Sequence, residues 1–309
     1  MVGKSIHDLL LKENYSNIIT AERVDLNLLD QSSVKKFFKK NKIDYVFMCA
    51  AKVGGIDANS TYPADFIYEN LQIQLNVINQ CHQNDVNNLL FLGSSCIYPK
   101  HSIQPIKESQ LLQGPLEETN QWYAIAKIAG IKLCESFNIQ YDRDYRCIMP
   151  TNLYGNNDNF HPVNSHVIPA LIRRFHEAKI NNADSISIWG TGKPKREFLH
   201  VEDMAKASVH VANLSKNSYL KNVQQDLSHI NIGTGNDISI KDLVKILCDV
   251  SGYSGKIFYD SSKPDGTPRK VLDTKKINDL GWSAEISLKK GLLKTYNWYV
   301  ENYSNITRK

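Results

Sequence analysis

The sequence predicts an α/β fold: a doubly wound parallel sheet followed by a smaller C-terminal lobe. Three observations predict it. Short apolar runs alternate with amphipathic stretches, which is the pattern of successive β-α-β units. Residues 45–50 and 89–93 are unbroken apolar runs, as expected of strands buried on both faces. After Pro150 the composition changes, with frequent Asn, Pro and His, and the 309 residues leave room for a second lobe.

The remaining elements follow from the spacing of apolar residues. Further strands are expected at residues 17–20, 146–149, 187–190 and 229–233. Helices are expected at residues 34–40, 66–83, 121–141, 240–250 and 286–303. Residues 152–169, rich in Asn, Pro and His, are expected to form a long ordered loop.

Composition excludes several classes of protein. No apolar run approaches the about 20 residues that a membrane-spanning helix needs. The first residues are interrupted by Lys4, His7 and Asp8, which is unlike a signal peptide, so a cytoplasmic location is expected. The six cysteines have no zinc-site spacing, which favours a reducing compartment and no metal. The net charge of +5 is modest and no basic block is interleaved with aromatics, so nucleic acid is not an expected partner.

Polar residues follow three of the predicted strands directly. The segments, each of which contains at least one polar residue, are Ala50-Ala51-Lys52, Ser94-Ser95-Cys96 and Pro150-Thr151-Asn152. In an open parallel sheet, ligands bind beyond the carboxyl ends of the strands. We therefore expect these segments to line one crevice of a Rossmann-type sheet.

Tyr123 and Lys127 suggest what happens in that crevice. They are four residues apart in a predicted helix, so both project from the same face. Reduction of a ketone requires a proton on the oxygen, and a phenol with a pKa of about 10 suits this role if an ammonium makes it more acidic. Ser94 can hydrogen-bond the same oxygen. The spacing alone is common on surface helices, but its place after a strand that ends in Ser-Ser favours catalysis.

Longer motifs identify a family. They are AAKVGGI at residues 50–56, YPADFI at 62–67, FLGSSCIYPK at 91–100, YAIAKIAG at 123–130, PTNLYG at 150–155, DNFHP at 158–162, SHVIPA at 165–170, REFLHV at 196–201 and KPDGTPRK at 263–270. These segments resemble the GDP-L-fucose synthase family of extended short-chain dehydrogenases/reductases. The resemblance extends from residue 1 to about residue 303.

The resemblance implies a two-stage reaction. The substrate would be GDP-4-keto-6-deoxy-D-mannose, epimerised at C3 and C5 and then reduced at C4 by NADPH to GDP-L-fucose. By resemblance, Cys96 and His166 exchange the carbon-bound protons, while Tyr123, Lys127 and Ser94 carry out the reduction. A thiol near positive charge and an imidazole both exchange protons near neutral pH. Which of the two acts as the base at each carbon stays open.

The cofactor preference depends on Arg23. It follows the strand expected at residues 17–20, where an acid would indicate NAD and an arginine accommodates the 2′-phosphate of NADP(H). Glu22 is an opposing signal, but the family also has an arginine at this place, which favours NADP(H). The resemblance implies cofactor contacts with Met1, Val2, Gly3, Arg23, Leu92, Gly93, Ser94, Ser95, Lys127, Pro150, Thr151, Asn152, Leu153 and His166.

The second half is expected to hold the nucleotide sugar. By resemblance, Arg196 and Lys270 pair with the pyrophosphate, and the pocket is also lined by Trp189, Asp265 and Arg174. This divides the chain into an NADP-binding domain at residues 1–160, with contributions from about 190–235, and a GDP-sugar-binding lobe mainly at residues 161–309. Related enzymes pair through the helix that bears the catalytic tyrosine, so a homodimer is expected.

The start of the sequence departs from the family pattern. Family members have a β-strand and a glycine-rich turn before a Met-Val-Gly sequence, which here is Met1-Val2-Gly3. The missing strand would lie at the centre of the sheet, and its loss would leave the backbone of both neighbours unpaired, so instability is expected. Two interpretations stay open: a truncated form of an ordinary enzyme, which we favour, or a natural short form that binds NADPH poorly.

Two other functions compete. One is another nucleotide-sugar epimerase or dehydratase on the same fold. Dehydratases place an acidic pair after the active-site Ser or Thr, whereas Ser94 is followed by Ser95 and Cys96, and a 4-epimerase needs no Cys-His pair. The other is a non-enzymatic, cofactor-impaired NADP-binding protein, against which the complete set of catalytic residues argues.

Overall fold

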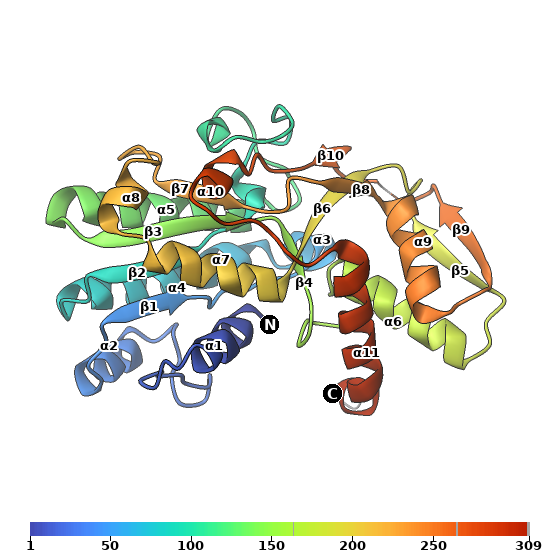
Figure 1. The fold of residues 1–309 in the computed structure, drawn as a ribbon, viewed down its shortest axis with the longest axis horizontal. Helices are drawn as coiled ribbons and strands as arrows, with labels where there is room; N and C mark the ends of the chain where they lie inside the picture. Colours follow the sequence, from blue (N-terminus) through green and yellow to red (C-terminus); the bar gives the residue numbers. More distant parts are fainter. Residues whose placement is uncertain (163, 264, 308–309) are drawn as a thin grey trace.

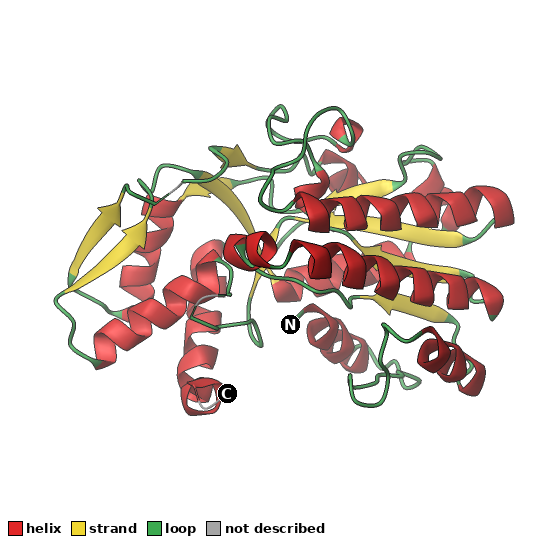
Figure 2. Ribbon diagram, turned by 180° about the vertical axis from the view of Figure 1, so that it is seen from behind, coloured by secondary structure: helices red, strands yellow, loops and turns green. Residues whose placement is uncertain are grey.

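The computed structural model describes residues 1–162, 164–263 and 265–307. One of its two lobes is built on a sheet of parallel strands in the spatial order β1 (Tyr45–Met48), β2 (Asn88–Leu92), β3 (Asp144–Pro150) and β7 (His229–Ile232). Helix α7 (Val201–Asn213) crosses one face (Figure 1), and α4 (Pro63–Gln83) and α5 (Gln121–Tyr141) cross the other (Figure 2). This arrangement confirms the predicted doubly wound α/β fold.

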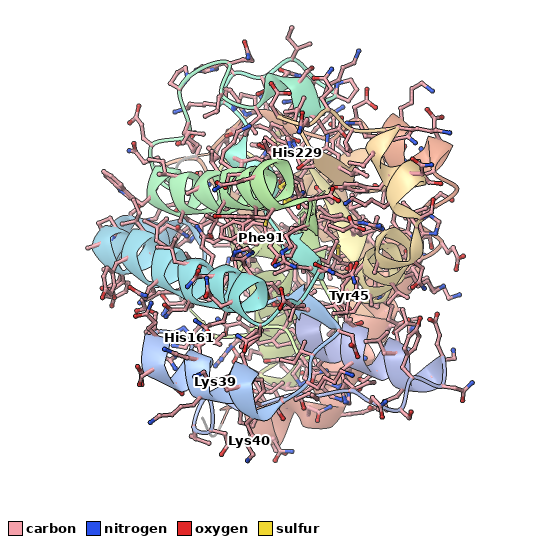
Figure 3. The ribbon with its side chains drawn as sticks, turned by 90° about the vertical axis from the view of Figure 1, so that its left-hand side faces the viewer. Lys39, Lys40, Tyr45, Phe91, His161 and His229 are labelled. Atoms are coloured by element: carbon pink, nitrogen blue, oxygen red, sulfur yellow. The ribbon has the colours of Figure 1, made fainter. Side chains whose placement is uncertain are left out.

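Two N-terminal helices extend these layers. Helix α1 (Val2–Lys12) packs against α7, with Ile6 and Leu10 buried in one apolar cluster with residues of α7. Helix α2 (Gln31–Lys40) packs against α4 and begins at Asp30, whose carboxylate accepts a hydrogen bond from the Ser32 N–H. Its lysines stay at the surface, as Figure 3 shows for Lys39 and Lys40, whereas Phe91 of β2 is fully buried.

The strand predicted at residues 17–20 is wrong. This segment lies in the irregular connection between α1 and α2, where Ile18 packs against the α1–α7 cluster and Ile19 is exposed. A strand requires a hydrogen-bonded neighbour, and within the described residues β1 pairs only with β2. The other edge of β1 is therefore unpaired in the described part of the chain.

The second lobe has its own core. Strands β5 (Ser185–Trp189) and β9 (Lys256–Asp260) form a parallel pair, at the right of Figure 1. Around them lie α6 (Val167–Ile180), α9 (Ile240–Ser251) and α11 (Leu288–Thr307). Large aromatic side chains such as Phe175 and Tyr299 fill the space between these elements.

A small sheet joins the two halves. It contains β4 (Asn152–Tyr154), β6 (Lys195–His200), β8 (Asp237–Ser239) and β10 (Arg269–Lys270). The predicted loop at residues 152–169 is therefore shorter than expected, because it starts with β4 and ends where α6 begins. Short helices complete the chain: α3 (Ile56–Thr61), α8 (Lys216–Leu220), α10 (Lys275–Asp279) and the 3-10 turns Ser95–Ile97 and Glu108–Gln110.

Most predicted helices are confirmed, with small shifts at their ends. The helix expected at residues 121–141 is α5 itself, and those expected at 34–40, 66–83, 240–250 and 286–303 correspond to α2, α4, α9 and α11. Within the ranges described, no helix combines the length and the apolar character needed to cross a bilayer.

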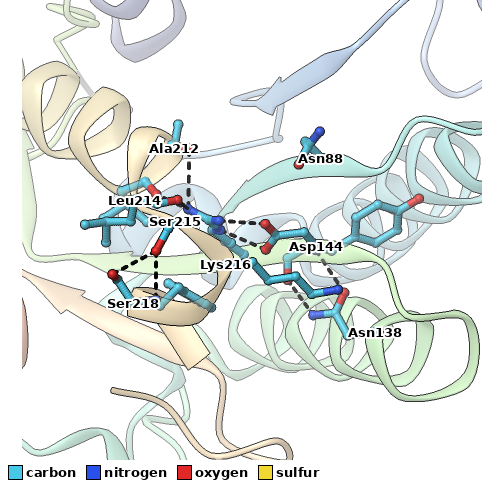
Figure 4. A network of polar contacts seen from close by, with 12 residues as sticks. Asn88, Asn138, Asp144, Ala212, Leu214, Ser215, Lys216 and Ser218 are labelled. Atoms are coloured by element: carbon cyan, nitrogen blue, oxygen red, sulfur yellow. Dashed lines mark hydrogen bonds and ion pairs between the residues drawn. The ribbon is translucent and has the colours of Figure 1, made fainter. Parts of the chain in front are cut away.

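A polar network holds the amino-terminal end of β3 in place (Figure 4). The buried Arg146 side chain pairs with Asp144 at 2.6 Å and donates to the Leu214 carbonyl at 2.8 Å, beyond the end of α7. Carbonyl groups at the carboxyl end of a helix have no hydrogen-bond partner inside it, and the Arg146 guanidinium supplies one here. The network ties α7 to β3 at the end of the sheet opposite the crevice.

Candidate active site

The carboxyl ends of β1, β2 and β3 place Cys49, Ser94 and Thr151 at one edge of the sheet. The start of α1 reaches the same edge, because a Cβ atom at Gly3 would lie 3.5 Å from the Cβ atom of Cys49. Its first turn contains no acidic residue. The free N–H groups of a helix start attract anions, so this position suits a phosphate.

Ser94 and Cys96 lie where β2 ends. The Ser94 Oγ atom accepts a hydrogen bond from the Cys96 N–H at 3.4 Å, which begins the 3-10 turn. Burial raises the pKa of the Cys96 thiol, whereas the nearby Lys270 ammonium, a Ser94 hydrogen bond and Lys127 act in the opposite direction. The thiol is thus protonated at neutral pH in a setting where cations stabilise its thiolate.

Lys127 lies inside the protein and has no carboxylate partner among the residues that the structure describes. Only 4% of its surface is exposed, and its Nζ atom donates to the Leu92 carbonyl at 2.8 Å. The Nζ atom lies 4.8 Å from the ring centroid of Phe91 and 5.7 Å from that of Tyr123. Burial lowers the pKa of Lys127 to about 8. An ammonium has three donors, and this is its one hydrogen bond within the described residues, so the others suit ribose hydroxyls.

Tyr123 sits one helical turn before Lys127 on α5 and packs edge-on against Phe66. Burial raises the pKa of its phenol, and the Cys96 thiolate would raise it further. Loss of hydration is the larger of these two effects. The acidifying effect of Lys127 on this phenol stays a prediction. The phenol stays protonated at neutral pH, which is the state of a proton donor.

His166 precedes α6 and its side chain caps no backbone group. Partial burial lowers the pKa of its imidazole, so it is mostly neutral at pH 7. The loop that carries it meets the segment after β1: the Gly55 N–H donates to the Asn164 carbonyl at 3.4 Å. A Cβ atom at Gly55 would lie 3.0 Å from the Ser165 carbonyl oxygen, so glycine permits this approach. No hydrogen bond joins His166 to Cys96 within the described residues.

The small sheet places two cations side by side, and one of them, Lys270, acts on Cys96. Arg196 on β6 is paired in register with Lys270 on β10. Burial lowers the pKa of both side chains. The charge of Arg196 acts on Lys270, and the carboxylate of Asp265 acts on Arg196. Two neighbouring, partly desolvated cations attract an anion with more than one negative charge, such as a pyrophosphate.

The other residues predicted to bind substrate lie further out in the second lobe. Asp265 accepts hydrogen bonds from the Thr191 N–H and hydroxyl, both at 2.7 Å. Trp189 is 59% exposed, and the Lys263 ammonium lies 5.4 Å from its ring centroid. Arg174 donates to the Ser187 carbonyl at 2.7 Å. Arg174 and Trp189 line a shallow hollow of about 420 Å³ between α6 and β5.

The other residues predicted to contact the cofactor differ in their exposure and in their hydrogen bonds. Arg23 is exposed in the turn between α1 and α2, with no hydrogen bond to its side chain within the described ranges. Thr151 and Asn152 already bond through their side chains to the Glu197 carbonyl. Gly93 leaves room for Met149, because a Cβ atom there would lie 2.2 Å from the Met149 sulfur. The remaining residues lie beside the same edge of the sheet: Met1, Val2, Leu92, Ser95, Pro150 and Leu153.

Sequence reasoning missed residues that hold the crevice in shape. Asn70 of α4 is 3% exposed and exchanges two hydrogen bonds of 3.0 Å with the backbone of Lys52. The Lys52 ammonium then pairs with Asp65 and Glu69. The signal available in the sequence was an Asn on the buried side of an amphipathic helix, where a polar side chain requires a partner.

Comparisons with known proteins agree with this geometry. Residues 1–233 match the NAD dependent epimerase/dehydratase family. The chain is 59% identical over 302 residues to GDP-L-fucose synthase of Escherichia coli K12, covering 98% of this chain and 94% of the relative. It is 52% identical to GDP-L-fucose synthase 1 of Arabidopsis thaliana, covering 99% and 92%.

Among solved structures, the chain resembles a GDP-mannoheptose C4 reductase from Campylobacter jejuni with NADP bound. The TM-score is 0.88 at 38% identity, covering 97% of this chain and 95% of the other. Identity of this extent along nearly the whole chain shows common descent. The chain therefore belongs to the NAD dependent epimerase/dehydratase family, within its GDP-L-fucose synthase branch.

Proposed function

We propose that this protein converts GDP-4-keto-6-deoxy-D-mannose to GDP-L-fucose by epimerisation at C3 and C5 followed by reduction at C4. The observation that carries the proposal is the convergence of a thiol, a phenol and a buried ammonium beyond the end of β2, in Cys96, Tyr123 and Lys127. The relatives of known name support the identity of the substrate.

NADPH is the cofactor, and when bound it supplies the hydride that reduces the C4 ketone. The residues present suit it in two places. The buried Lys127 ammonium has donors left for ribose hydroxyls, and the start of α1 offers free N–H groups to a pyrophosphate. The exposed Arg23 provides a positive charge for the 2′-phosphate, and His166 lines the cofactor side of the crevice.

Epimerisation requires one group to remove a carbon-bound proton and another to return one on the opposite face. The ketone at C4 makes the hydrogens at C3 and C5 acidic. Cys96 becomes a base when the adjacent cations stabilise its thiolate, and the neutral imidazole of His166 both accepts and donates protons. Cys96 and His166 are the acid–base pair of this stage.

Reduction requires a proton on the C4 oxygen. The phenol of Tyr123 is protonated at neutral pH and donates it, while the Ser94 hydroxyl hydrogen-bonds the same oxygen. The resulting phenolate is stabilised by the Lys127 ammonium next to its ring. These residues thus act after the two carbon centres have been inverted.

The GDP moiety binds mainly to residues 161–309, opposite a cofactor-binding domain of residues 1–160 with contributions from about 190–235. Arg196 and Lys270 face the pyrophosphate. Trp189, Asp265 and Arg174 complete the pocket, and the separate apolar core of this lobe supports its role as a distinct unit.

The protein functions in the cytoplasm as a homodimer. Helices α4 and α5 lie side by side on one surface (Figure 2). That surface exposes Tyr68, Leu75, Trp122 and Ile125. Exposed apolar side chains in such number are typical of an interface. Sedimentation of the wild-type chain and of Ile125→Glu tests this: a dimer that the substitution dissociates is expected.

The proposed reaction is tested by mixing the protein with NADPH and the 4-keto nucleotide sugar. We expect loss of nicotinamide absorbance and a product that co-elutes with GDP-L-fucose. Cofactor consumption with formation of another GDP-sugar would indicate a different member of the fold family. No consumption by folded protein would contradict the proposal and favour a non-enzymatic NADP-binding protein.

A further inference from the structure

A buried tyrosine lies two residues after Cys96. Tyr98 is 3% exposed and follows the 3-10 turn that carries Cys96. Its hydroxyl reaches across to β7, where it lies 3.0 Å from the His229 Nε2 atom and 2.5 Å from the Asn231 Oδ1 atom. His229, labelled in Figure 3, is fully buried. The contact links the Cys96 loop to a strand more than a hundred residues away.

The direction of each hydrogen bond in this group is fixed by its neighbours. The Asn231 Nδ2 group donates to the carbonyls of Ile106 at 2.9 Å and Asp273 at 3.3 Å, so its Oδ1 atom is the acceptor for Tyr98. Since the Tyr98 hydroxyl donates its single hydrogen to Asn231, the His229 Nε2 atom must donate to Tyr98. His229 is neutral, because burial lowers its pKa to about 3, and its buried Nδ1 atom has no partner in the described ranges.

Asn231 also holds the segment that contains Lys270. The Asp273 carbonyl that the Asn231 side chain contacts belongs to this segment. In the same segment, Leu272 forms an isolated parallel β-bridge with Ile106. The Asn231 backbone N–H donates to Glu108 at 3.1 Å, so the loop before α5 is bound from the same strand position. One side chain therefore connects the Cys96 loop, through Tyr98, with the segment that brings the Lys270 ammonium to the thiol.

From this geometry we infer that the Tyr98–Asn231 hydrogen bond is a positioning contact for the epimerisation stage: it holds Cys96 at the distance from Lys270 that its acid–base role requires. The inference rests on the proposed function, in which Cys96 exchanges the C3 and C5 protons. Tyr98 and Asn231 touch neither substrate nor cofactor in this account. They act through Cys96.

The charged and titratable groups around the two sites are distinct. Cys96 is influenced by Lys270, Lys127 and the phenol of Tyr123. Glu108 and Lys276, which lie 3.8 Å apart, and Lys132 are the charged groups around the Tyr98–His229 end. His229 stays neutral throughout the working range, because burial lowers its pKa to about 3. A pH effect on Cys96 after a change at Tyr98 therefore reports movement of the thiol relative to its own neighbours.

The test substitutes Tyr98→Phe and measures three quantities. Deuterium exchange at C3 and C5 is expected to fall on the order of 10- to 100-fold, because displacement of a reacting group by about an ångström has effects of that size. Reduction of a substrate that has already been epimerised is expected to stay near the wild-type rate. Alkylation of Cys96 by iodoacetamide, followed by peptide mass spectrometry against pH, is expected to show a higher apparent pKa for the thiol.

Tyr219→Phe is the matched control. Tyr219 is 1% exposed, its hydroxyl donates to the Ser228 carbonyl just before β7, and it accepts from the Cys147 N–H. Tyr219→Phe thus removes an equally buried tyrosine hydroxyl beside the start of β7, whose bonds in the part of the chain described go to Ser228 and Cys147 and not to Asn231, and should leave the exchange-to-reduction ratio unchanged. The double variant Tyr98→Phe/Asn231→Ala should exchange deuterium no more slowly than Asn231→Ala alone, because both substitutions break the same hydrogen bond.

The outcomes separate this inference from the proposed function. Equal loss of exchange and reduction in Tyr98→Phe, or the same ratio as in Tyr219→Phe, would overturn the positioning role. Additive effects in the double variant would overturn it as well. If Cys96→Ser itself retains full exchange, the proposed function of Cys96 fails instead, whatever Tyr98→Phe shows.

Discussion

The ammonium of Lys127 donates a 2.8 Å hydrogen bond to the carbonyl oxygen of Leu92, the last residue of the strand that leads to Ser94 and Cys96. This bond fixes helix α5 to the end of β2. Tyr123 is on the same helix and Cys96 is on the turn after the strand, so this contact sets the position of Tyr123, the proposed proton donor, relative to Cys96, the proposed epimerisation base.

In the proposed mechanism, Lys127 sets the alkaline limit of the reduction step. With a pKa lowered to about 8, the ammonium is charged below that pH and loses its charge above it. We expect the rate of reduction to fall as the pH rises through about 8, more steeply than the rate of C3 and C5 exchange. Lys127→Arg, which stays charged, should move this limit upward. A pH–rate profile of single-turnover reduction measures it, and a profile that is flat up to pH 10 would contradict the assignment.

The pH dependence of folding stability that Lys127 causes has the opposite sign to the pH dependence of reduction. The unfolded lysine has an ordinary pKa near 10.5 and the folded one is lower, so the unfolded chain binds more protons between about 8 and 10.5. The contribution of Lys127 to folding free energy therefore becomes more favourable as the pH rises through this window. Urea unfolding of wild type and Lys127→Met at pH 7.5 and 9.5 compares the two. An identical difference at both pH values would argue against a buried ammonium.

Tyr123→Phe removes the proposed proton donor and keeps the ring against Phe66. We expect reduction to fall by about 10²- to 10⁴-fold, which is the usual contribution of a general acid. Deuterium exchange at C3 and C5 should continue, because Cys96 and His166 are intact. Exchange followed by NMR and NADPH oxidation followed by absorbance report the two stages. Loss of exchange together with reduction would show that the phenol serves both.

Cys96→Ser has the complementary effect. A serine hydroxyl fits the space of the thiol but does not ionise near neutral pH, so exchange at one or both carbons should collapse by about 10²-fold or more. Reduction of a substrate already epimerised should persist. Cys248→Ser, a change at a partly exposed cysteine on α9, is the control and should alter neither rate. Unchanged exchange in Cys96→Ser would remove the thiol from the mechanism.

Asp144→Asn tests the Arg146 network, which ties α7 to β3 at the end of the sheet opposite the crevice. It leaves the Arg146 guanidinium buried without its ionic partner, and removing one member of a buried pair costs about 3–5 kcal/mol of unfolding free energy. Asp142→Asn, at the exposed pair with Lys216, should leave the unfolding free energy close to that of the wild type. Urea denaturation of the three proteins gives the comparison, and equal effects would show that the Arg146 network is not a strong constraint.

The sequence predicts the sheet well because the local signals of its strands are strong. The apolar runs at β1, β2 and β3 need only their own composition to be recognised, and Tyr123 and Lys127 are four residues apart on α5. The strand at residues 17–20 failed for the opposite reason. Its apolar pair, Ile18 and Ile19, satisfies the composition of a strand, but pairing depends on an edge that composition does not reveal.

Contacts between distant residues were also invisible in the sequence. Tyr98 and Asn231 are separated by 133 positions, and nothing in either local pattern indicates that they meet. The same holds for the protonation of Tyr123. Its spacing to Lys127 suggested a phenol made more acidic, but the burial that raises its pKa arises from side chains brought in by other elements.

The central claim is that one site on this chain both inverts C3 and C5 and reduces C4. Turnover of GDP-4-keto-6-deoxy-D-mannose with NADPH in deuterium oxide, followed by NMR of the isolated product, tests it most directly. The account predicts GDP-L-fucose with deuterium at both C3 and C5 and one NADPH oxidised per molecule formed. A product reduced at C4 but carrying no deuterium at either carbon would contradict it, because the protein would then be a reductase alone.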